Sequence, residues 1–534
     1  MRYNKGMEKS DLTAASATEN QAEIAALKAR VSELEVLVKY YEEQFRISKH
    51  RQYEASSEKS EYDLAQLSIF NEAELFADIN VAEPELVEVE KHYRKRTRLT
   101  TDKLPENLPV EIVEHDLPEC ERICPECGGP LHVMGRDSWD ELVIVPAQVK
   151  VRKHVRLVYT CRECEKDEYG VPIVKAAVSE PVIKGSFASP EAIAHIMTQK
   201  FVMGSPLYRQ EKELQQNGIQ LSRQTMSNWL IRATEDWLEL VYEALHEMLC
   251  NHGVLHADET TLQVLREPGK TAQSKSYMWL YRTSGDAVQP IVLYDYQPDR
   301  RSKRPAAFLK DFKGYLHTDG YEGYHSLRSE ITVVGCWAHV RRKFDESLKA
   351  LPERDRESSN ALRGKRYCDH LFELEREFSS LAPEERYVKR LAQSKPVLEE
   401  FFEWAVSLNA APKTGIGIAV HYALSQRKYL EHYLLDGRLE ISNNRAERSI
   451  KPFVVDRKNF LFANTPREAK ASAVMFSLIE TAKENGLNPF EYLVYILKNA
   501  PNWNIRDNPD ALNLLMPDSA RRSICATATS RTPA

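Results

Sequence analysis

Two kinds of residue in this chain have the types and spacing that chemistry requires: acids set into apolar segments, and paired cysteines. The stretch "VLHADETTLQVL", residues 254–265, carries Asp258 and Glu259 in the middle of a β-branched, apolar run. A strand interior normally excludes carboxylates, because a buried charge without a partner is costly or shifts its pKa. Either these acids are solvated on an edge strand, or a rigid strand holds one of them to bind a metal.

The order of elements after residue 250 favours the metal-binding interpretation. Three β-rich runs at hairpin spacing are followed by a helix and two further strands: "GVLHADETTLQVL", "KSYMWLYRT", "AVQPIVLYDY", then "RPAAFLKDF", "GYLHTDGYEGY" and "ITVVGCWAHV". This is the order of the ribonuclease H-like α/β fold, whose first and fourth strands are neighbours. We therefore expect Asp258 and Asp319 to point at one site. Alternation along the strand sends Glu259 to the opposite face, although Glu259 stays the alternative ligand.

A third carboxylate should come from a later helix packed against the sheet. Glu447, in "ISNNRAERSIKPFVVDRKNFLF", is the best candidate, and it shares one helical face with Asn443 and Lys451. From the residues alone, an ordinary exposed helix acid is the favoured interpretation. A long, mostly helical insertion, residues 345–440, separates Glu447 from Asp319. An Asp-Asp-Glu cluster suits Mg²⁺ or Mn²⁺, and two such ions would serve an in-line displacement at phosphorus.

Paired cysteines form two C-x-x-C knuckles, in "CPECGGPLHV" and "YTCRECEKD". The segment between them, "LVIVPAQVKVRKHVRLVYT", is typical of two strands that would bring the knuckles together around one tetrahedral structural Zn²⁺. The predicted ligands are Cys124, Cys127, Cys161 and Cys164; the alternative is four free thiols. Cys120 has no assigned role, and Cys336 and His339 in "GCWAHVRR" could either pack in the core or support the acidic site.

The N-terminal region has a heptad pattern. Apolar residues alternate spacings of three and four: Ile24, Leu27, Val31, Leu34, Val38, Tyr41 and Phe45. This pattern predicts a short coiled coil that joins two or more copies, with a single docked amphipathic helix as the alternative. The linker that follows has a basic run that could contact phosphates or simply be solvated: Lys91, Arg94, Lys95, Arg96 and Arg98.

A helical hairpin is predicted in "SPLYRQEKELQQNGIQLSRQTMSNWLIRATEDW". A first helix ends at the Asn217-Gly218 break, and Ser222 caps a second helix. This is the outline of a helix-turn-helix, whose second helix would present Arg223, Gln224 and Asn228 to DNA. An αα-hairpin that binds nothing has the same outline.

The composition is that of an ordinary globular protein, with 42% hydrophobic and 28% charged residues among 534. Its net charge of -6 is weak evidence against nucleic-acid binding, because a local basic patch is enough to contact a phosphate backbone. The N-terminus shows no secretory signal, and no apolar stretch approaches the ~20 residues of a membrane helix. Nine cysteines without an export signal favour thiols or metal ligands, and hence the cytoplasm.

Several long phrases, in order, resemble bacterial DDE transposases of the insertion-sequence-sixty-six family. They include "GIQLSRQTMSNW", "HADET", "TDGYEGY", "GCWAHVRRKF", "ISNNRAERSIKPFVVDRKNFLF" and "SLIETAKENGLNPFEYL". The resemblance runs from the heptads to about residue 500, with small departures at "GSPLY" and "WAHV". It implies that Asp258, Asp319 and Glu447 are the catalytic triad and the ligands of the Mg²⁺ or Mn²⁺ ions. Arg448 and Lys451 are added to the expected DNA contacts.

The expected activity is cleavage of the DNA strand at each end of an insertion sequence, followed by strand transfer to target DNA. Expected partners are terminal inverted repeats, target DNA, further copies of the chain and accessory proteins from the same element, in the nucleoid and with no membrane. A structure-specific nuclease and a zinc-containing DNA-binding regulator are the alternatives. The expected multidomain α+β organisation is coiled coil 1–60, linker 61–110, zinc module 111–180, DNA-binding helices 181–250, core 251–344, insertion 345–440, second part of the core 441–500 and tail 501–534.

Overall fold

A computed structural model describes residues 149–160 and 173–529. The predicted coiled coil, the basic linker and the four predicted zinc ligands lie outside these residues. The chain divides into two compact units, one of Lys59–Val178 and the other of Met1–Glu58 with Ser179–Ala534. It is a mixed, multidomain α+β protein.

The described part of the smaller unit is an antiparallel pair of strands, β1 (Val158–Thr160) and β2 (Ile173–Lys175). Of the segment in which two strands were expected between the cysteine knuckles, residues 149–157 are not strand, and its earlier residues lie outside the described part of the chain. The last three residues before the second knuckle pair instead with residues beyond it. The Arg156 side chain adds a 2.7 Å hydrogen bond to the Ala176 carbonyl.

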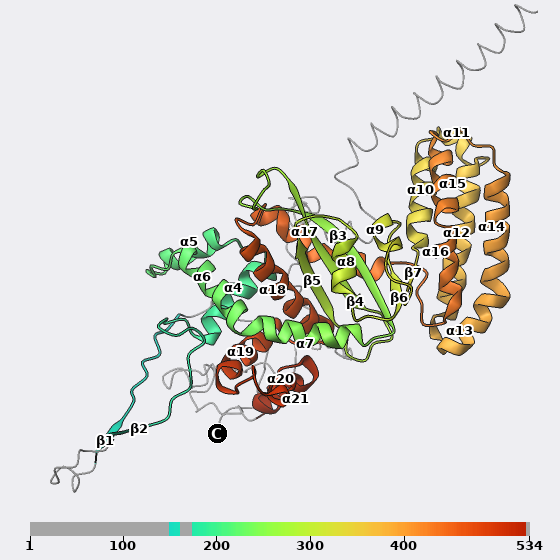
Figure 1. The fold of residues 1–534 in the computed structure, drawn as a ribbon. Helices are drawn as coiled ribbons and strands as arrows, with labels where there is room; N and C mark the ends of the chain where they lie inside the picture. The colour runs from blue at the N-terminus through green and yellow to red at the C-terminus, as the bar shows by residue number, and fades with distance from the viewer. Residues whose placement is uncertain (1–148, 161–172, 530–534) are drawn as a thin grey trace, which may run out of the picture. The chain divides into compact units, whose positions relative to one another are not determined.

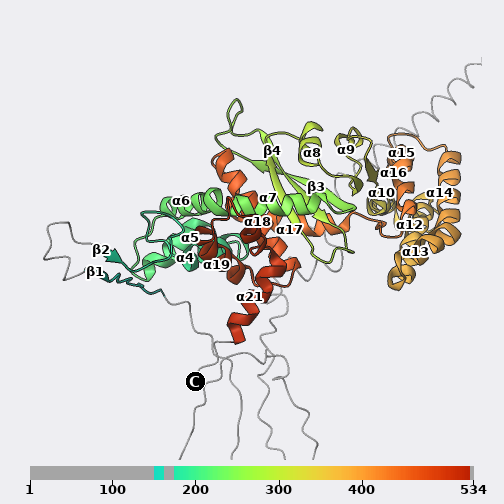
Figure 2. The same ribbon diagram turned by 60° about the horizontal axis from the view of Figure 1, so that its bottom comes forward.

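Helices open the described part of the larger unit: α4 (Pro190–Phe201), α5 (Leu207–Gln216), α6 (Arg223–Ala233), a π-helical turn (Thr234–Leu238) and α7 (Glu239–Cys250). The predicted helical hairpin is confirmed as α5 and α6, which lie together in Figure 2. Gly218 turns the chain with a φ of 77°, a conformation that favours glycine. The Ser222 hydroxyl caps α6 by accepting the Thr225 N–H at 3.1 Å.

A five-stranded mixed sheet forms the centre of this unit, in the order β5-β4-β3-β6-β7. The strands are β3 (Val254–Gln263), β4 (Lys275–Thr283), β5 (Val292–Gln297), β6 (Gly314–His317) and β7 (Ile331–Val334). The first three form an antiparallel meander, whereas β6 pairs parallel with both β3 and β7. The expected adjacency of the first and fourth of these strands, β3 and β6, is therefore confirmed.

Both later strands are shorter than their sequences suggest. The Asp319 carboxylate accepts the backbone N–H of Tyr321 at 3.0 Å, and this local turn replaces ladder bonds, so β6 ends at His317 and α9 (Glu322–His325) follows. β7 ends at Val334 because the Gly335 N–H donates to the Tyr429 carbonyl at 2.9 Å. The early end of β6 leaves Asp319 on a loop just past its strand.

The two faces of the sheet carry different helices (Figure 1). On one face lie α17 (Asn444–Phe460) and α18 (Pro466–Glu484): Arg282 of β4 donates there to Glu484 at 3.0 Å and to Ser449. On the other face, Tyr281 of β4 stacks on Phe308 of α8 (Lys303–Phe308) with ring centroids 3.9 Å apart. Hydroxyls of α18 also satisfy the outer edge of β5, which leaves this edge strand covered.

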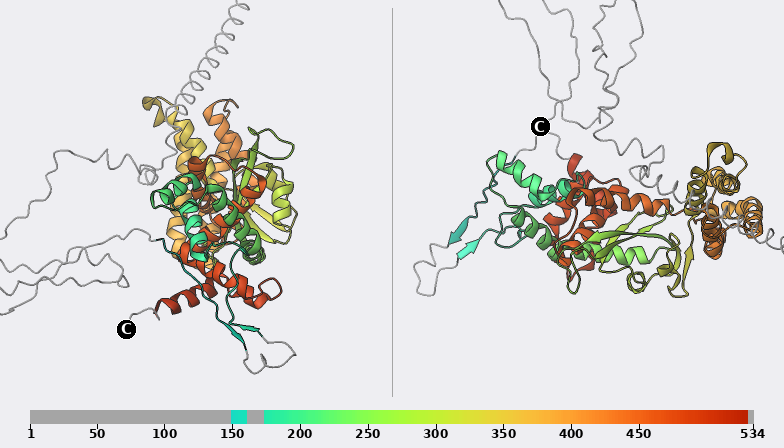
Figure 3. Two further views of the ribbon diagram at one scale, coloured as in Figure 1. Left: turned by 90° about the vertical axis from the view of Figure 1, so that its left-hand side faces the viewer. Right: turned by 90° about the horizontal axis from the view of Figure 1, so that it is seen from above.

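A helical insertion separates β7 from α17. Its elements are α10 (Trp337–Lys349), α11 (Glu353–Arg356), α12 (Asn360–Glu377), α13 (Pro383–Lys389), α14 (Lys395–Ser407), α15 (Gly415–Ser425) and α16 (Arg427–Glu431). Figures 1 and 3 show α10, α12, α14 and α15 side by side as a bundle beyond β7. The bundle has a hydrophobic core of its own, which includes Trp337, Phe344 and Phe401.

Three further helices follow α18: α19 (Pro489–Asn499), α20 (Pro509–Asn513) and α21 (Pro517–Thr529). These helices pack against the rest of the unit, because Leu515, Met516 and Ala520 are buried in the main hydrophobic core. Within residues 149–160 and 173–529, no helix has both the length and the apolar character that a membrane crossing requires.

Candidate active site

Two aspartates reach the site from neighbouring strands. Asp258 lies opposite Leu280 in the β3–β4 register, and Glu259 lies opposite Trp279. Because directly opposed residues share a face, Asp258 is on the same face as Arg282, the face that α17 covers. Asp319 follows β6, the other neighbour of β3, and its turn holds the carboxylate in place.

Glu447 comes to the same region from the first turn of α17. One carboxylate oxygen lies 3.2 Å from an Arg342 guanidinium nitrogen, and the other lies 3.6 Å from Nε2 of His339. The second oxygen, Oε1, is buried and has no hydrogen-bond partner among the described residues. Glu447 therefore has acceptor capacity that its protein neighbours do not use.

The electrostatics of Asp258 show that Asp319 and Glu447 both act on it. Burial raises the pKa of Asp258 well above its usual range, and the negative charges of Glu259, Asp319 and Glu447 add to the rise. A cation beside Asp258 would relieve this repulsion. The negative charges that act on Asp258 and the unused oxygen of Glu447 suit a hard divalent ion, which prefers oxygen ligands. Among the described residues, the ligand atoms that lie within 4.8 Å of one another are those of Cys336, His339 and Glu447.

Glu259, the alternative ligand, is held on the other face. Its side chain is only 2% exposed, and it accepts hydrogen bonds from Nε of Arg300 at 2.8 Å and from the Tyr324 hydroxyl at 2.6 Å. Burial raises its pKa, and Asp319 adds to the rise while Arg300 opposes it. Glu259 thus already has a protein cation as its partner.

A layer of buried polar residues that the sequence reasoning missed lies beside the aspartates. His256 and His317 precede Asp258 and Asp319 by two residues each, and their rings stack with centroids 4.4 Å apart. Burial lowers the pKa of His256 to about 3 and that of His317 well below its usual range, so both rings are neutral. The repeated H-x-D in "HADET" and "HTDGY" was the available signal.

The sequence alone does not decide whether Cys336 and His339 pack in the core or support the acidic site. Cys336 is buried, and burial raises the pKa of its thiol to about 11, so it stays protonated. Its sulfur, a His339 nitrogen and a Glu447 oxygen lie within 4.8 Å of one another. Both residues therefore pack directly against the third acid.

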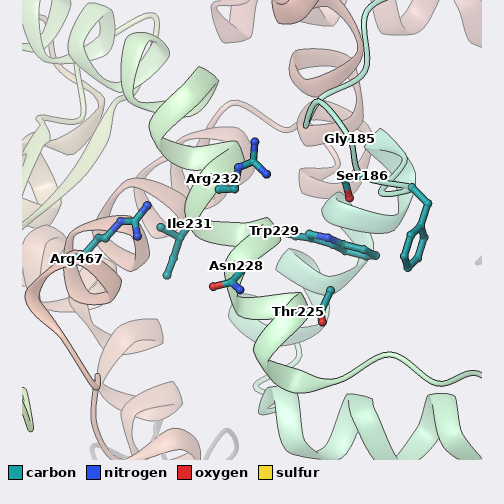
Figure 4. Close-up of a pocket in the computed structure, with 9 residues that line it drawn as sticks. Gly185, Ser186, Thr225, Asn228, Trp229, Ile231, Arg232 and Arg467 are labelled. Atoms are coloured by element: carbon teal, nitrogen blue, oxygen red, sulfur yellow. The ribbon is translucent and has the colours of Figure 1, made fainter.

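The expected DNA-contacting residues of α6, Arg223, Gln224 and Asn228, are all exposed, whereas Met226 and Leu230 on the same helix are buried. A cavity of about 380 Å³ opens beside this helix (Figure 4). Its lining includes Asn228, Trp229, Arg232, Phe187 and Arg467. Arg232 is a further exposed cation on α6 that the sequence reasoning did not select.

On α17, Arg448 and Lys451 are exposed, as DNA contacts require. The other expected contacts, Arg94, Lys95 and Arg96, and the zinc ligands Cys124, Cys127, Cys161 and Cys164 lie outside the described residues.

Comparison with known proteins first gives the class of protein. Residues 185–471 match the model described as Transposase IS66 family, and residues 477–517 match the IS66 C-terminal element. Residues 121–165, which contain all four predicted zinc ligands, match the zinc-finger binding domain of transposase IS66. Residues 40–113 match the model described as Transposase C of IS166 homeodomain. The chain is thus a transposase, a nucleic-acid-cleaving and DNA-binding protein.

The particular family follows from the same matches: the chain belongs to the IS66 family of transposases. Three similar proteins come from Sinorhizobium fredii (strain NBRC 101917 / NGR234), and each carries the description of an uncharacterized protein. The protein y4jD is 30% identical over 73% of this chain and 77% of its own length. The corresponding coverages are 74% and 72% for y4qI, and 81% and 79% for y4hP, both also 30% identical.

Proposed function

We propose that Asp258, Asp319 and Glu447 are the catalytic triad of a ribonuclease H-like core that cuts and joins DNA at the ends of an insertion sequence. The main support for this proposal is that Asp319 and Glu447, which come from separate segments of the chain, both raise the pKa of the buried Asp258. A carboxyl whose pKa is raised by burial and by neighbouring acids is common at functional sites.

The three acids would hold two Mg²⁺ or Mn²⁺ ions. When bound, these ions would activate the attacking oxygen and stabilise the leaving oxygen of a displacement at phosphorus. The chain would contribute the ionised carboxylate of Asp258, whose raised pKa a bound cation would lower, and the free oxygen of Glu447. Arg342 beside Glu447 is half-exposed and offers a positive charge to a phosphate.

Two displacements account for the proposed reaction. In the first, water attacks phosphorus at the element's end, the bond to the 3′-oxygen breaks, and a 3′-hydroxyl is released. In the second, that hydroxyl loses its proton as its oxygen attacks a phosphorus of target DNA and displaces another 3′-oxygen. The first displacement hydrolyses one phosphodiester bond and leaves a 5′-phosphate beside the 3′-hydroxyl, and the second exchanges one phosphodiester bond for another; neither forms a covalent protein intermediate.

Recognition of the terminal repeats would use several surfaces. The exposed face of α6 carries Arg223, Gln224 and Asn228, with Arg232 beside the cavity. We assign one structural Zn²⁺ to Cys124, Cys127, Cys161 and Cys164, which the zinc-finger match supports. The basic linker and exposed side chains of α17 would add phosphate contacts, and the N-terminal heptads would join the copies that hold two ends. Accessory proteins from the same element would take part.

The test uses purified full-length protein, labelled DNA that carries the element's ends, and Mg²⁺. Glu447→Gln keeps the size of the side chain but removes its charge, and cleavage and strand transfer should fall together by about 10³-fold or more. Asp258→Asn and Asp319→Asn should behave alike, while all three variants still shift the labelled ends in a gel.

Near-wild-type cleavage by Glu447→Gln would refute the triad. Cleavage without joining by the wild-type protein would favour the nuclease alternative. End binding with neither activity would favour the regulator.

A further inference from the structure

Asn443 stands at the N-cap position of α17, but its side chain makes no capping hydrogen bond. An asparagine at this position normally accepts a backbone N–H of the first turn, which stabilises the helix by about 1 kcal/mol. Asn443 is fully buried, so its amide must find partners elsewhere.

The partners of the Asn443 amide are the two residues just before Asp258. Its nitrogen donates to the Ala257 carbonyl at 2.8 Å, and its oxygen lies 3.0 Å from Nδ1 of His256. A carbonyl can only accept, so the amide nitrogen has to face Ala257 and the oxygen has to accept the Nδ1–H of the neutral His256. Both hydrogen-bonding ends of Asn443 are thus used on β3.

The backbone around Asn443 is tied to the other strands of the site. The Asn443 N–H donates to Sγ of Cys336 at 3.1 Å, and the Glu440 N–H donates to Nε2 of His317 at 3.2 Å. Cys336 follows β7, and His317 ends β6 two residues before Asp319. The segment that leads into α17 therefore bonds to β3, to β6 and to Cys336, two residues after β7.

One backbone hydrogen bond connects this segment to Glu447. The Glu447 N–H donates to the Asn443 carbonyl at 3.2 Å, as the first turn of an α-helix requires. The path from Asp258 to Glu447 thus runs through its neighbour Ala257, across the amide of Asn443 and along one helical turn. Chain connectivity cannot set this distance, because the insertion lies between the two strands and α17.

We propose that Asn443 is a positioning residue that sets the distance of Glu447 from Asp258 and Asp319. This inference rests on the proposed function, because it takes Glu447 as the third acid. Residues that orient metal ligands contribute about 10–100-fold to metal affinity or activity.

Two variants separate positioning from helix capping. Asn443→Ser and Asn443→Asp both place good N-cap residues before α17. The Asp carboxylate cannot donate to Ala257, and the shorter Ser side chain has one oxygen in place of the two amide atoms that reach Ala257 and His256. The control is Asn444→Ser, at the adjacent and exposed first residue of α17.

Mn²⁺ binding to the full-length protein is measured by electron paramagnetic resonance, and the signal that Asp258→Asn loses is assigned to the site. Both Asn443 variants should need about 10–100-fold more Mn²⁺ for half-saturation, while melting cooperatively. Asn444→Ser should match the wild type. The Mn²⁺ concentration for half-maximal cleavage of DNA ends should shift in parallel.

A folded Asn443→Ser protein with wild-type Mn²⁺ affinity would overturn the proposal, and so would unfolding of both variants, which would make Asn443 a folding residue only. Glu447→Gln in the same titration distinguishes failure of the positioning role of Asn443 from failure of the proposed triad. If Glu447→Gln loses Mn²⁺ and cleavage but Asn443→Ser does not, the positioning role alone fails. If Glu447→Gln keeps both, the proposed triad fails.

Discussion

The substitution Glu259→Gln tests which of two adjacent acids serves the site. It keeps the size of the side chain and one oxygen for the Tyr324 hydroxyl, but it removes the negative charge that faces Arg300. Because Glu259 and Asp258 lie on opposite faces of β3, we expect the loss of stability and the loss of activity to separate.

The magnitude follows from burial. Removing one partner of a buried ion pair costs about 3–5 kcal/mol. Here the Glu259 side chain is 2% exposed but the Arg300 side chain is 39% exposed, so the guanidinium can return to water. Burial also raises the pKa of Glu259, which shows that its charge is already costly in the folded state. We therefore expect a loss of about 1–3 kcal/mol in the free energy of unfolding.

Urea denaturation gives the change in stability, and cleavage of labelled DNA ends with Mg²⁺ gives the activity. Glu259→Gln should keep the cleavage rate within about tenfold of the wild type, because a small shift of Asp258 that raises the activation free energy by roughly 1 kcal/mol slows the reaction only a few-fold. Glu322→Gln, an exposed acid in the first turn of α9, is the matched control and should change neither quantity. A folded Glu259→Gln protein that binds ends normally but cleaves as poorly as Glu447→Gln would refute the assignment of the two faces.

Three further predictions concern metal, assembly and pH. Protein purified without chelator should contain about one zinc per chain by elemental analysis, as one four-thiolate site requires; no zinc would refute that site. Deleting residues 1–60 should lower the oligomer mass in light scattering, and an unchanged mass would make the heptads a docked helix. Burial raises the pKa of Asp456 from 3.8 to about 7, with Glu480 adding to the rise and Lys483 and Lys200 opposing it. The stability that this proton contributes is present below pH 3.8 and lost as the pH rises through about 7. Asp456→Asn should therefore stabilise the protein at pH 8 by at most roughly 4 kcal/mol, and by less than half of that gain at pH 5; equal gains in urea denaturation would contradict the assignment.

Local signals predicted the elements that are determined locally. The Asn217-Gly218 break and the Ser222 cap marked the ends of α5 and α6 because turn and cap chemistry depends on neighbouring residues. The neighbouring positions of β3 and β6 followed from element order, which limits the possible sheet topologies.

Features that depend on distant partners could not be predicted in this way. "ITVVGCWAHV" is typical of a long strand, but β7 stops after four residues because Gly335 bonds to Tyr429, almost a hundred residues later. Asn443 reads as a helix cap, yet its amide is used on β3. In both cases a tertiary hydrogen bond outweighs the local preference, and its partner cannot be identified from residue spacing.

The insertion contributes directly to the acidic site. Its first helix supplies His339 and Arg342 to Glu447, and Tyr422 of α15 lies so close to Gly320 that a Cβ there would meet its hydroxyl at 2.7 Å.

At the far end of the insertion, the buried Arg390 pairs with Glu375 and donates to the carbonyls of Tyr433, Asp436 and Leu439. These bonds fix the chain shortly before Asn443, where the contacts to β3 begin. An unpaired buried guanidinium would be costly, so the bundle and the returning segment have to fold together. We therefore infer that the position of Glu447 depends on the strands through Asn443 and on the insertion through Arg390, so that helices α10 to α16, which a minimal nuclease would not need, help to hold Glu447 in place.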